Sequence, residues 1–257
     1  MTKAIRSKRL RRFYIEEINS DDKLCVITGS EAKHITKVLR MTPGDRFILM
    51  DGEGSRFEAL IESVSSREVV VLLENRLPEP LPSAVNITLC QALLKPSAMD
   101  YLIQKTSELG VDCILPFFSG RTVISFDEDR LANKMRHWRE IAKNSAKQCG
   151  RSVPVKIETP CSFKELMVKW HGEKALKAIL WEDERSKNFK TLLKSSSAIK
   201  RFMGIVGSEG GFTWEEIEAA GEAGFESASM GGRVLRAETA AITMVAVVQY
   251  ELGDLSL

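Results

Sequence analysis

Two glycine-rich segments in the C-terminal part of the sequence are the best candidates for holding a ligand. The first, 207–211 (Gly-Ser-Glu-Gly-Gly), follows an apolar run of strand composition and precedes a helix expected from Thr213. Glycines let a ligand approach the backbone closely, and the N–H groups at a helix start attract polar ligands. No Lys-Ser/Thr pair follows the last glycine, and the spacing is not GxGxxG. The segment therefore predicts a polar-ligand site outside the standard nucleotide-binding motifs.

The second segment, 230–240, repeats this order of strand, glycines and helix start. Arg236 and Glu238 lie at the helix start, where their side chains can reach over the carboxyl edge of a sheet. Open α/β sheets bind their ligands at that edge. The pair therefore indicates a reactive site, although an isolated Arg/Glu couple is also common as a surface ion pair.

The basic residues are concentrated in two blocks. Residues 1–12 hold six lysines and arginines and no acid, and residues 130–156 hold eight and one acid, in a chain whose net charge is only +2. Two such blocks on an otherwise acidic chain indicate a polyanionic partner, nucleic acid first, although either block could also be a solvated surface. The candidate RNA-binding residues are Arg9, Arg11, Arg12, Arg136, Arg139, Lys143, Lys147 and Arg151.

The elements that position these residues fall into two groups, separated by three prolines within residues 78–82. Five short strands and one helix precede the prolines, which predicts a small β-barrel. In that helix, Ala32, Ile35, Val38 and Leu39 are expected on one apolar face. We expect this first domain to cover residues 1–78.

After the prolines, strands alternate with helices, which predicts a mainly parallel sheet covered by helices and hence an α/β fold over 79–257. Ser97, Ser162 and Thr213 each precede an acidic residue by three positions, so three helices are expected to start with capping boxes. The last helix is apolar almost all round from 240 to 248. It is expected to be buried in the core or against a second copy of the chain.

Composition excludes several classes of protein. Hydrophobic residues make up 44% and charged residues 28%, as in ordinary globular proteins. The longest apolar stretch, 239–250, is too short for a membrane helix, and no apolar segment of a signal peptide follows the basic N-terminus. Five cysteines without a CxxC pair indicate reduced thiols and a cytoplasmic protein. Three scattered histidines support no metal site.

Several motifs in order resemble the family of small-subunit ribosomal RNA uridine-N3 methyltransferases, the RsmE family. The most specific are Val-Gly-Ser-Glu-Gly-Gly-Phe at 206–212 and Gly-Arg-Val-Leu-Arg-Ala-Glu-Thr-Ala at 232–240. Further similar segments are 11–14, 34–40, 105–111 and 148–151. The family usually has proline where this chain has Ser208, a change that removes a stiffening residue from the loop.

The resemblance implies a PUA-like barrel over 1–78 and a SPOUT domain over 79–257, with a trefoil knot near the C-terminus. It also implies S-adenosylmethionine as cofactor, a homodimer, and methylation of uridine N3 in 16S ribosomal RNA or the small ribosomal subunit. Arg236 is expected to stabilise the uracil anion, and Glu209 to accept a proton or bind substrate. The expected cofactor-binding residues are Leu180, Trp181, Glu182, Gly207, Ser208, Glu209, Gly210, Gly211, Met230, Gly231, Val234 and Leu235.

Two other functions are compatible with parts of the sequence. A non-catalytic RNA-binding protein of the same fold would keep the basic blocks but bind no cofactor. An α/β enzyme acting on a phosphorylated small molecule would explain the loop before Thr213 and leave both basic blocks unexplained.

Overall fold

The computed structural model describes residues 10–15, 18, 23–80, 83–122, 128–195 and 199–255. The chain forms two compact units. The first consists of Met1–Leu81 and the short segment Ala146–Val153, and the second of Pro82–Ser145 and Pro154–Leu257.

The first unit contains a five-stranded sheet with the order β1-β3-β4-β5-β2. Its strands are β1 (Arg12–Tyr14), β2 (Leu24–Thr28), β3 (Arg46–Met50), β4 (Arg56–Val64) and β5 (Glu68–Arg76). The β1–β3 pair is parallel, and the other three pairs are antiparallel. The inward side chains, among them Phe13, Phe47 and Val71, form the core of this unit.

The helix of the first unit follows the predicted pattern only in part. α1 (Gly29–Lys33) continues into a π-helical turn, η1 (His34–Val38). Ile35 is fully buried, as expected, but Val38 is 69% exposed. The prediction for Val38 is wrong because a π turn holds more residues than an α turn and rotates the following side chains away from the α-helical face.

Contacts to Ala146–Val153 complete the first unit. Tyr14 is buried, and its hydroxyl donates to the carbonyl oxygen of Arg151 at 2.7 Å. Burial raises the pKa of this phenol. Arg12 donates to the carbonyl oxygen of Lys147 at 3.3 Å, and the Lys147 ammonium pairs with Glu31. Residues from both predicted basic blocks therefore hold this unit together.

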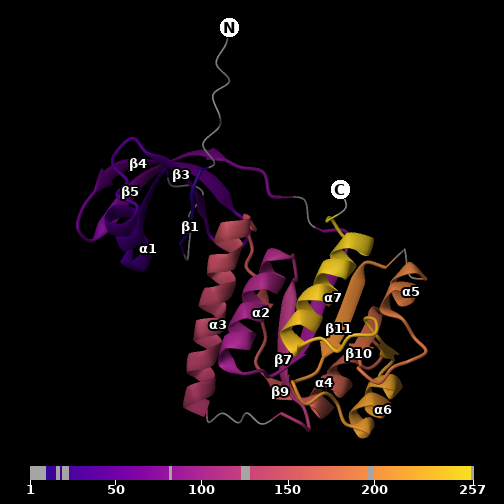
Figure 1. Cartoon of the computed structure of the whole chain (residues 1–257). Helices are drawn as coiled ribbons and strands as arrows, with labels where there is room; N and C mark the ends of the chain where they lie inside the picture. Colours follow the sequence, from indigo (N-terminus) through magenta and orange to yellow (C-terminus); the bar gives the residue numbers. More distant parts are fainter. Residues whose placement is uncertain are drawn as a thin grey trace. The chain divides into compact units, whose positions relative to one another are not determined.

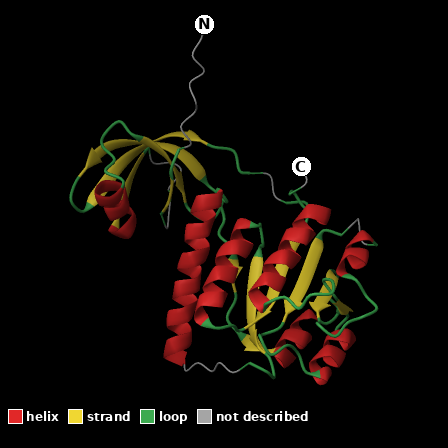
Figure 2. Ribbon diagram, viewed as in Figure 1, coloured by secondary structure: helices red, strands yellow, loops and turns green. Residues whose placement is uncertain are grey.

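The second unit is an α/β structure, as predicted (Figures 1 and 2). Its sheet has the order β12-β10-β11-β6-β7-β8, and every pair in this order is parallel. The strands are β6 (Asn86–Ala92), β7 (Cys113–Phe118), β8 (Lys156–Ile157), β9 (Cys161–Ser162), which pairs with β7, β10 (Leu176–Leu180), β11 (Arg201–Val206) and β12 (Glu226–Ala228).

Helices cover both faces of this sheet. On one face α2 (Pro96–Glu108), α3 (Glu128–Cys149), α5 (Phe189–Lys194) and α7 (Ala237–Leu252) bury a large apolar cluster, which includes Leu102, Trp138 and Met244. On the other face α4 (Phe163–Trp170) and α6 (Trp214–Glu222) bury a smaller cluster. Strand side chains alternate between the two, since Leu89 lies in the first cluster and Cys90 in the second.

Two of the three predicted capping boxes are confirmed. Ser162 and Thr213 each accept a bond from a backbone N–H three residues on, and the glutamates there bond back. The prediction for Ser97 is wrong, because α2 begins one residue earlier, at Pro96. Proline is favoured at the first helical position, which places Ser97 inside the first turn. Asp100 instead accepts a bond from His137 on α3 at 2.8 Å.

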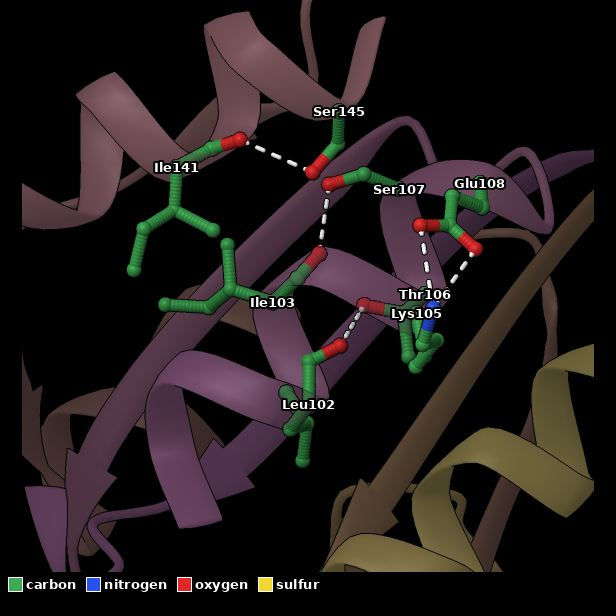
Figure 3. Close-up of polar contacts among 8 residues, drawn as sticks. All are labelled: Leu102, Ile103, Lys105, Thr106, Ser107, Glu108, Ile141 and Ser145. Atoms are coloured by element: carbon green, nitrogen blue, oxygen red, sulfur yellow. Dashed lines mark hydrogen bonds and ion pairs between the residues drawn. The ribbon is translucent and has the colours of Figure 1, made fainter. Parts of the chain in front are cut away.

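The segment 105–111 has a structural role between α2 and α3. The hydroxyls of Thr106 and Ser107 donate to the carbonyl oxygens of Leu102 and Ile103, one turn earlier. Figure 3 shows the hydroxyls of Ser107 and Ser145, both buried, pointing toward each other across the two helices. The bonds to their own helices satisfy these buried hydroxyls where α2 and α3 face each other.

Candidate active site

Four neighbouring strands of the parallel sheet, β12, β10, β11 and β6, end at the same edge. The loops that follow them enclose a cavity of about 810 Å³. This volume lies within the range of small-molecule and cofactor sites. The cavity lies at the carboxyl edge of the sheet, where ligands of open α/β sheets bind.

The cavity is lined by the residues that the sequence singled out. Of the predicted cofactor-binding residues, all but Gly210 line it, and so do Arg236 and Glu238. Gly210 is exposed in the same loop, and its carbonyl oxygen accepts a bond from Arg121 at 2.9 Å. The sequence reasoning missed the lining residues Lys95, Tyr101, Arg185 and Arg233.

The signal for Lys95 was present in the sequence. It directly precedes Pro96 and follows the strand β6, which ends at the same edge as the two glycine-rich segments. Tyr101 lies one turn farther along α2, and the helical pattern alone gives no reason to place it at the cavity. Arg185 and Arg233 are exposed in the same loops as predicted residues, and Arg233 lies within the segment 230–235 whose backbone was expected to hold the cofactor.

The loop 207–211 is held by a side chain of the neighbouring strand β6. The amide Nε2 of Gln91, which is fully buried in β6, donates to the carbonyl oxygen of Gly207 at 3.0 Å. Gly211 has φ of +69°, and a Cβ at this position would collide with the carboxylate of Glu182. Glycine is therefore favoured here for its conformation, and any other residue would also displace the flexible Glu182 side chain.

Ser208 carries an unsatisfied polar group in this loop. The residue is 8% exposed and lines the cavity. Within the described part of the chain, its buried Oγ has no hydrogen-bond partner. Buried hydroxyls normally have a partner, so this oxygen is suited to bond a ligand in the cavity.

Glu184 organises the loop after β10. Its buried carboxylate accepts bonds from the backbone N–H groups of Ser186 at 2.7 Å and Lys187 at 3.1 Å, and from the hydroxyl of Ser227. These bonds, that of Ser227 first, lower the pKa of Glu184 to about 2. The loop that carries Trp181, Glu182 and Arg185 is therefore tied to the strand β12.

The two residues predicted to act on a substrate lie at the cavity from different loops. Arg236 directly precedes α7, and its carbonyl oxygen accepts a bond from the N–H of Ala240 at 2.8 Å. Its side chain is exposed at the cavity, and so is that of Glu209. The following helix fixes its backbone, and the guanidinium extends from this point beside the cavity.

The predicted RNA-binding residues are distributed differently. Arg136 and Arg139 are exposed on α3, and Lys143 is partly exposed one turn on. Lys147 and Arg12 make the intramolecular contacts described above. Arg11 is exposed, Arg151 is partly buried, and Arg9 lies outside the described residues.

Over the described ranges, no group of three or more His, Cys, Asp or Glu side chains is placed to hold a metal ion. No helix in that part of the chain is long and apolar enough to cross a membrane.

Comparison with known families defines the class of protein. A family described as "RNA methyltransferase domain" matches residues 81–249, and one described as "RNA methyltransferase PUA domain" matches residues 27–74. The chain belongs to this family of RNA methyltransferases, with an α/β domain after a PUA domain. Within it the relatives are ribosomal RNA small subunit methyltransferases E, so the resemblance seen in the sequence is confirmed.

Two relatives and two solved structures illustrate the similarity. The methyltransferase E of Buchnera aphidicola from Acyrthosiphon pisum is 28% identical, over 98% of this chain and 97% of its own. The methyltransferase E of Bacillus subtilis is 28% identical over 88% of this chain and 89% of its own. A Legionella pneumophila protein described as a methyltransferase, solved with bound SAM, is 33% identical with a TM-score of 0.88, over 96% and 100%. The Neisseria gonorrhoeae methyltransferase E, solved with S-adenosylmethionine, is 28% identical with a TM-score of 0.87, over 96% and 99%.

Proposed function

We propose that this protein methylates N3 of a uridine in small-subunit ribosomal RNA, with S-adenosylmethionine as the methyl donor. The observation that carries the proposal is the convergence of two glycine-rich loops and Arg236 on one cavity at the carboxyl edge of the sheet. Relatives named ribosomal RNA small subunit methyltransferase E support the choice of RNA.

The cavity fits the chemistry of this cofactor. The cofactor carries cationic sulfonium and amino groups and an anionic carboxylate, and the cavity offers partners of both signs: the acids Glu182, Glu209 and Glu238 and the cations Lys95, Arg185, Arg233 and Arg236. The unsatisfied Ser208 hydroxyl can bond a polar atom of the cofactor. Two similar proteins were solved with it bound. We assign its binding to the predicted residues that line the cavity, with Gly210 completing the loop through its bond from Arg121.

Transfer to uracil N3 requires that this nitrogen lose its proton. When bound, the cofactor supplies an electrophilic methyl group. Arg236 stabilises the negative charge that develops on the uracil, and Glu209 accepts the proton or binds the base. The loops hold the base so that N3 is aligned for attack.

RNA is bound outside the cavity. We assign phosphate contacts to the exposed α3 residues Arg136 and Arg139 and the partly exposed Lys143, together with Arg9, Arg11, Arg12, Lys147 and Arg151. Residues 1–78 form the PUA-like domain in this proposal, and residues 79–257 form the SPOUT domain with its knot. A ribosomal RNA substrate implies a cytoplasmic site of action.

A homodimer is part of the proposal. α7 is apolar, yet Ile242, Val247 and Tyr250 retain exposed surface. Light scattering should give twice the chain mass of 28.7 kDa. A monomer at micromolar concentration would contradict this part of the proposal.

One binding measurement and one activity measurement separate the enzyme from a non-catalytic RNA-binding protein of the same fold. The enzyme binds S-adenosylhomocysteine in calorimetry and transfers labelled methyl groups to small-subunit RNA or assembled subunits. RNA binding without cofactor binding would favour the non-catalytic protein.

A further inference from the structure

Two indole rings lie together beside the cavity, and the proposed reaction uses only one of them. Trp181 lines the cavity. Trp214, the first residue of α6, packs against it with 5.5 Å between ring centroids and 61° between ring planes. Trp214 does not line the cavity and is 59% exposed. Tryptophan is on average highly buried, so this exposed ring calls for an explanation.

The Trp214 ring is held in a fixed orientation. Its Nε1–H donates to Oε1 of Glu218, one turn further along α6, at 2.8 Å. The Trp181 ring supports it from a second direction, and the loop that carries Trp181 is anchored by Glu184. A side chain that is already fixed loses little conformational entropy when a ligand binds. An exposed, fixed aromatic surface is suited to ligand binding rather than to core packing.

We propose that Trp214 stacks on an unpaired nucleobase of the RNA, next to the nucleotide that is methylated. The inference rests on the function proposed above. Uridine N3 lies on the base-pairing edge, so the target base must be unpaired, and opening it removes stacking from its neighbours. Aromatic side chains replace such stacking without regard to sequence. Because Trp214 lies outside the cavity, it receives a neighbouring base and not the target.

The charges around Trp214 favour a base over the phosphate backbone. Glu215 and Glu218 are both exposed on the same turn of α6. Their carboxylates repel phosphates, so an RNA strand can approach this ring only through the uncharged face of a base. Arg233, and Arg185, which pairs with Asp183 at 3.8 Å, line the cavity and supply cations for the backbone there. A stacking contact releases no counterions, so its contribution to RNA affinity should not depend on salt concentration.

The test compares full-length Trp214→Ala, Trp214→Phe and the control Trp170→Phe with the wild-type protein. Trp170 is a matched control because it ends α4, does not line the cavity, and stacks under the Lys169 ammonium. The probe is a short single-stranded oligouridylate. Its binding is followed by tryptophan fluorescence in the presence of saturating S-adenosylhomocysteine and at several salt concentrations. Calorimetry gives the affinity for S-adenosylhomocysteine, and circular dichroism verifies folding.

Stacking predicts that Trp214→Ala weakens oligouridylate binding by roughly 5- to 150-fold, the equivalent of a stacking contact. The salt slope and the affinity for S-adenosylhomocysteine should not change. Trp214→Phe should retain most of the affinity and lose most of the quenching, whereas Trp170→Phe should match the wild type. Unchanged RNA binding by a folded Trp214→Ala protein would overturn the inference, as would an equal loss of S-adenosylhomocysteine affinity.

Failure of the proposed function has a different signature. A wild-type protein that binds no S-adenosylhomocysteine would refute the methyltransferase proposal. If such a protein still showed quenching of Trp214 fluorescence by RNA, the contact between Trp214 and a base would be supported. If RNA caused no quenching, the inference about Trp214 would be overturned.

Discussion

The buried amide of Gln91 donates to the carbonyl oxygen of Gly207 at 3.0 Å and so connects the end of β6 to the first glycine of the cavity loop. Gln91 is fully buried and does not line the cavity. The neighbouring strand β6 therefore positions the loop through Gln91, a side chain that does not contact a ligand in the cavity.

Gln91→Met should weaken both the fold and cofactor binding. The substitution keeps the length of the side chain but leaves the carbonyl oxygens of Ala92 and Gly207 without this donor, which costs about 1–3 kcal/mol for a buried group. Removal of the buried, unpaired Oε1 of Gln91 offsets part of this loss. Urea unfolding should show this loss, and calorimetry should show weaker binding of S-adenosylhomocysteine. Gln104→Met, on the exposed face of α2, is the control and should change neither. A Gln91→Met protein with wild-type cofactor affinity would show that the loop does not need this bond.

Glu184 should make the protein sensitive to acid. Its pKa is lowered from 4.5 to about 2, so the charged form is preferred in the folded protein. The carboxylate therefore stabilises the fold above about pH 4.5, and this contribution disappears as the pH falls toward 2. Glu184→Gln should lower the free energy of unfolding by about 1–3 kcal/mol at neutral pH.

The difference between wild type and Glu184→Gln should shrink as the pH falls below about 4.5, as measured by urea unfolding at several pH values. Glu222→Gln, exposed at the end of α6, is the control. An equal difference at every pH would mean that the carboxylate charge contributes nothing to stability.

The cations of α3 should contribute to RNA binding through phosphate contacts. Replacing Arg136, Arg139 and Lys143 with alanine should weaken binding and reduce the log–log salt slope by roughly 0.7–0.9 for each phosphate that is no longer neutralised. Cofactor affinity should not change. A triple alanine variant at Lys190, Lys194 and Lys200 removes the same charge from other exposed positions and serves as the control. Equal salt slopes of RNA binding in the two triple variants would show that these α3 residues form an ordinary solvated surface.

Arg236 should matter for the reaction more than for binding. Loss of one preorganised charge-stabilising donor lowers turnover by on the order of 10²–10³-fold. Arg236→Ala should therefore fold and bind S-adenosylhomocysteine normally, yet lose most activity in single-turnover assays. Arg236→Lys should restore little, because lysine lacks the two-pronged geometry of the guanidinium. Near-normal turnover of Arg236→Ala at saturating RNA would refute its assignment, and failure to fold would give the residue a structural role instead.

The sequence predicted the parallel α/β arrangement and the two glycine-rich loops of the cavity, because strands and glycine-rich turns are local features. The resemblance to the RsmE family implied the other cavity residues that were predicted. The sequence did not predict features that depend on neighbours distant in sequence. Val38 is exposed because the helix changes to a π turn, and Lys147 is paired because Glu31 from another element meets it. Tyr101 lies beside the cavity only because α2 follows a strand adjacent to β11. The knot and the dimer stay predictions.

The most direct test of the central claim is to identify the methylated nucleoside. The wild-type protein is incubated with labelled S-adenosylmethionine and either small-subunit RNA or assembled small subunits lacking the modification, and the RNA is digested to nucleosides. The account predicts label in 3-methyluridine with at least one of the two substrates, and a much weaker signal with Arg236→Ala. Label in another nucleoside, or no label with either substrate, would contradict it.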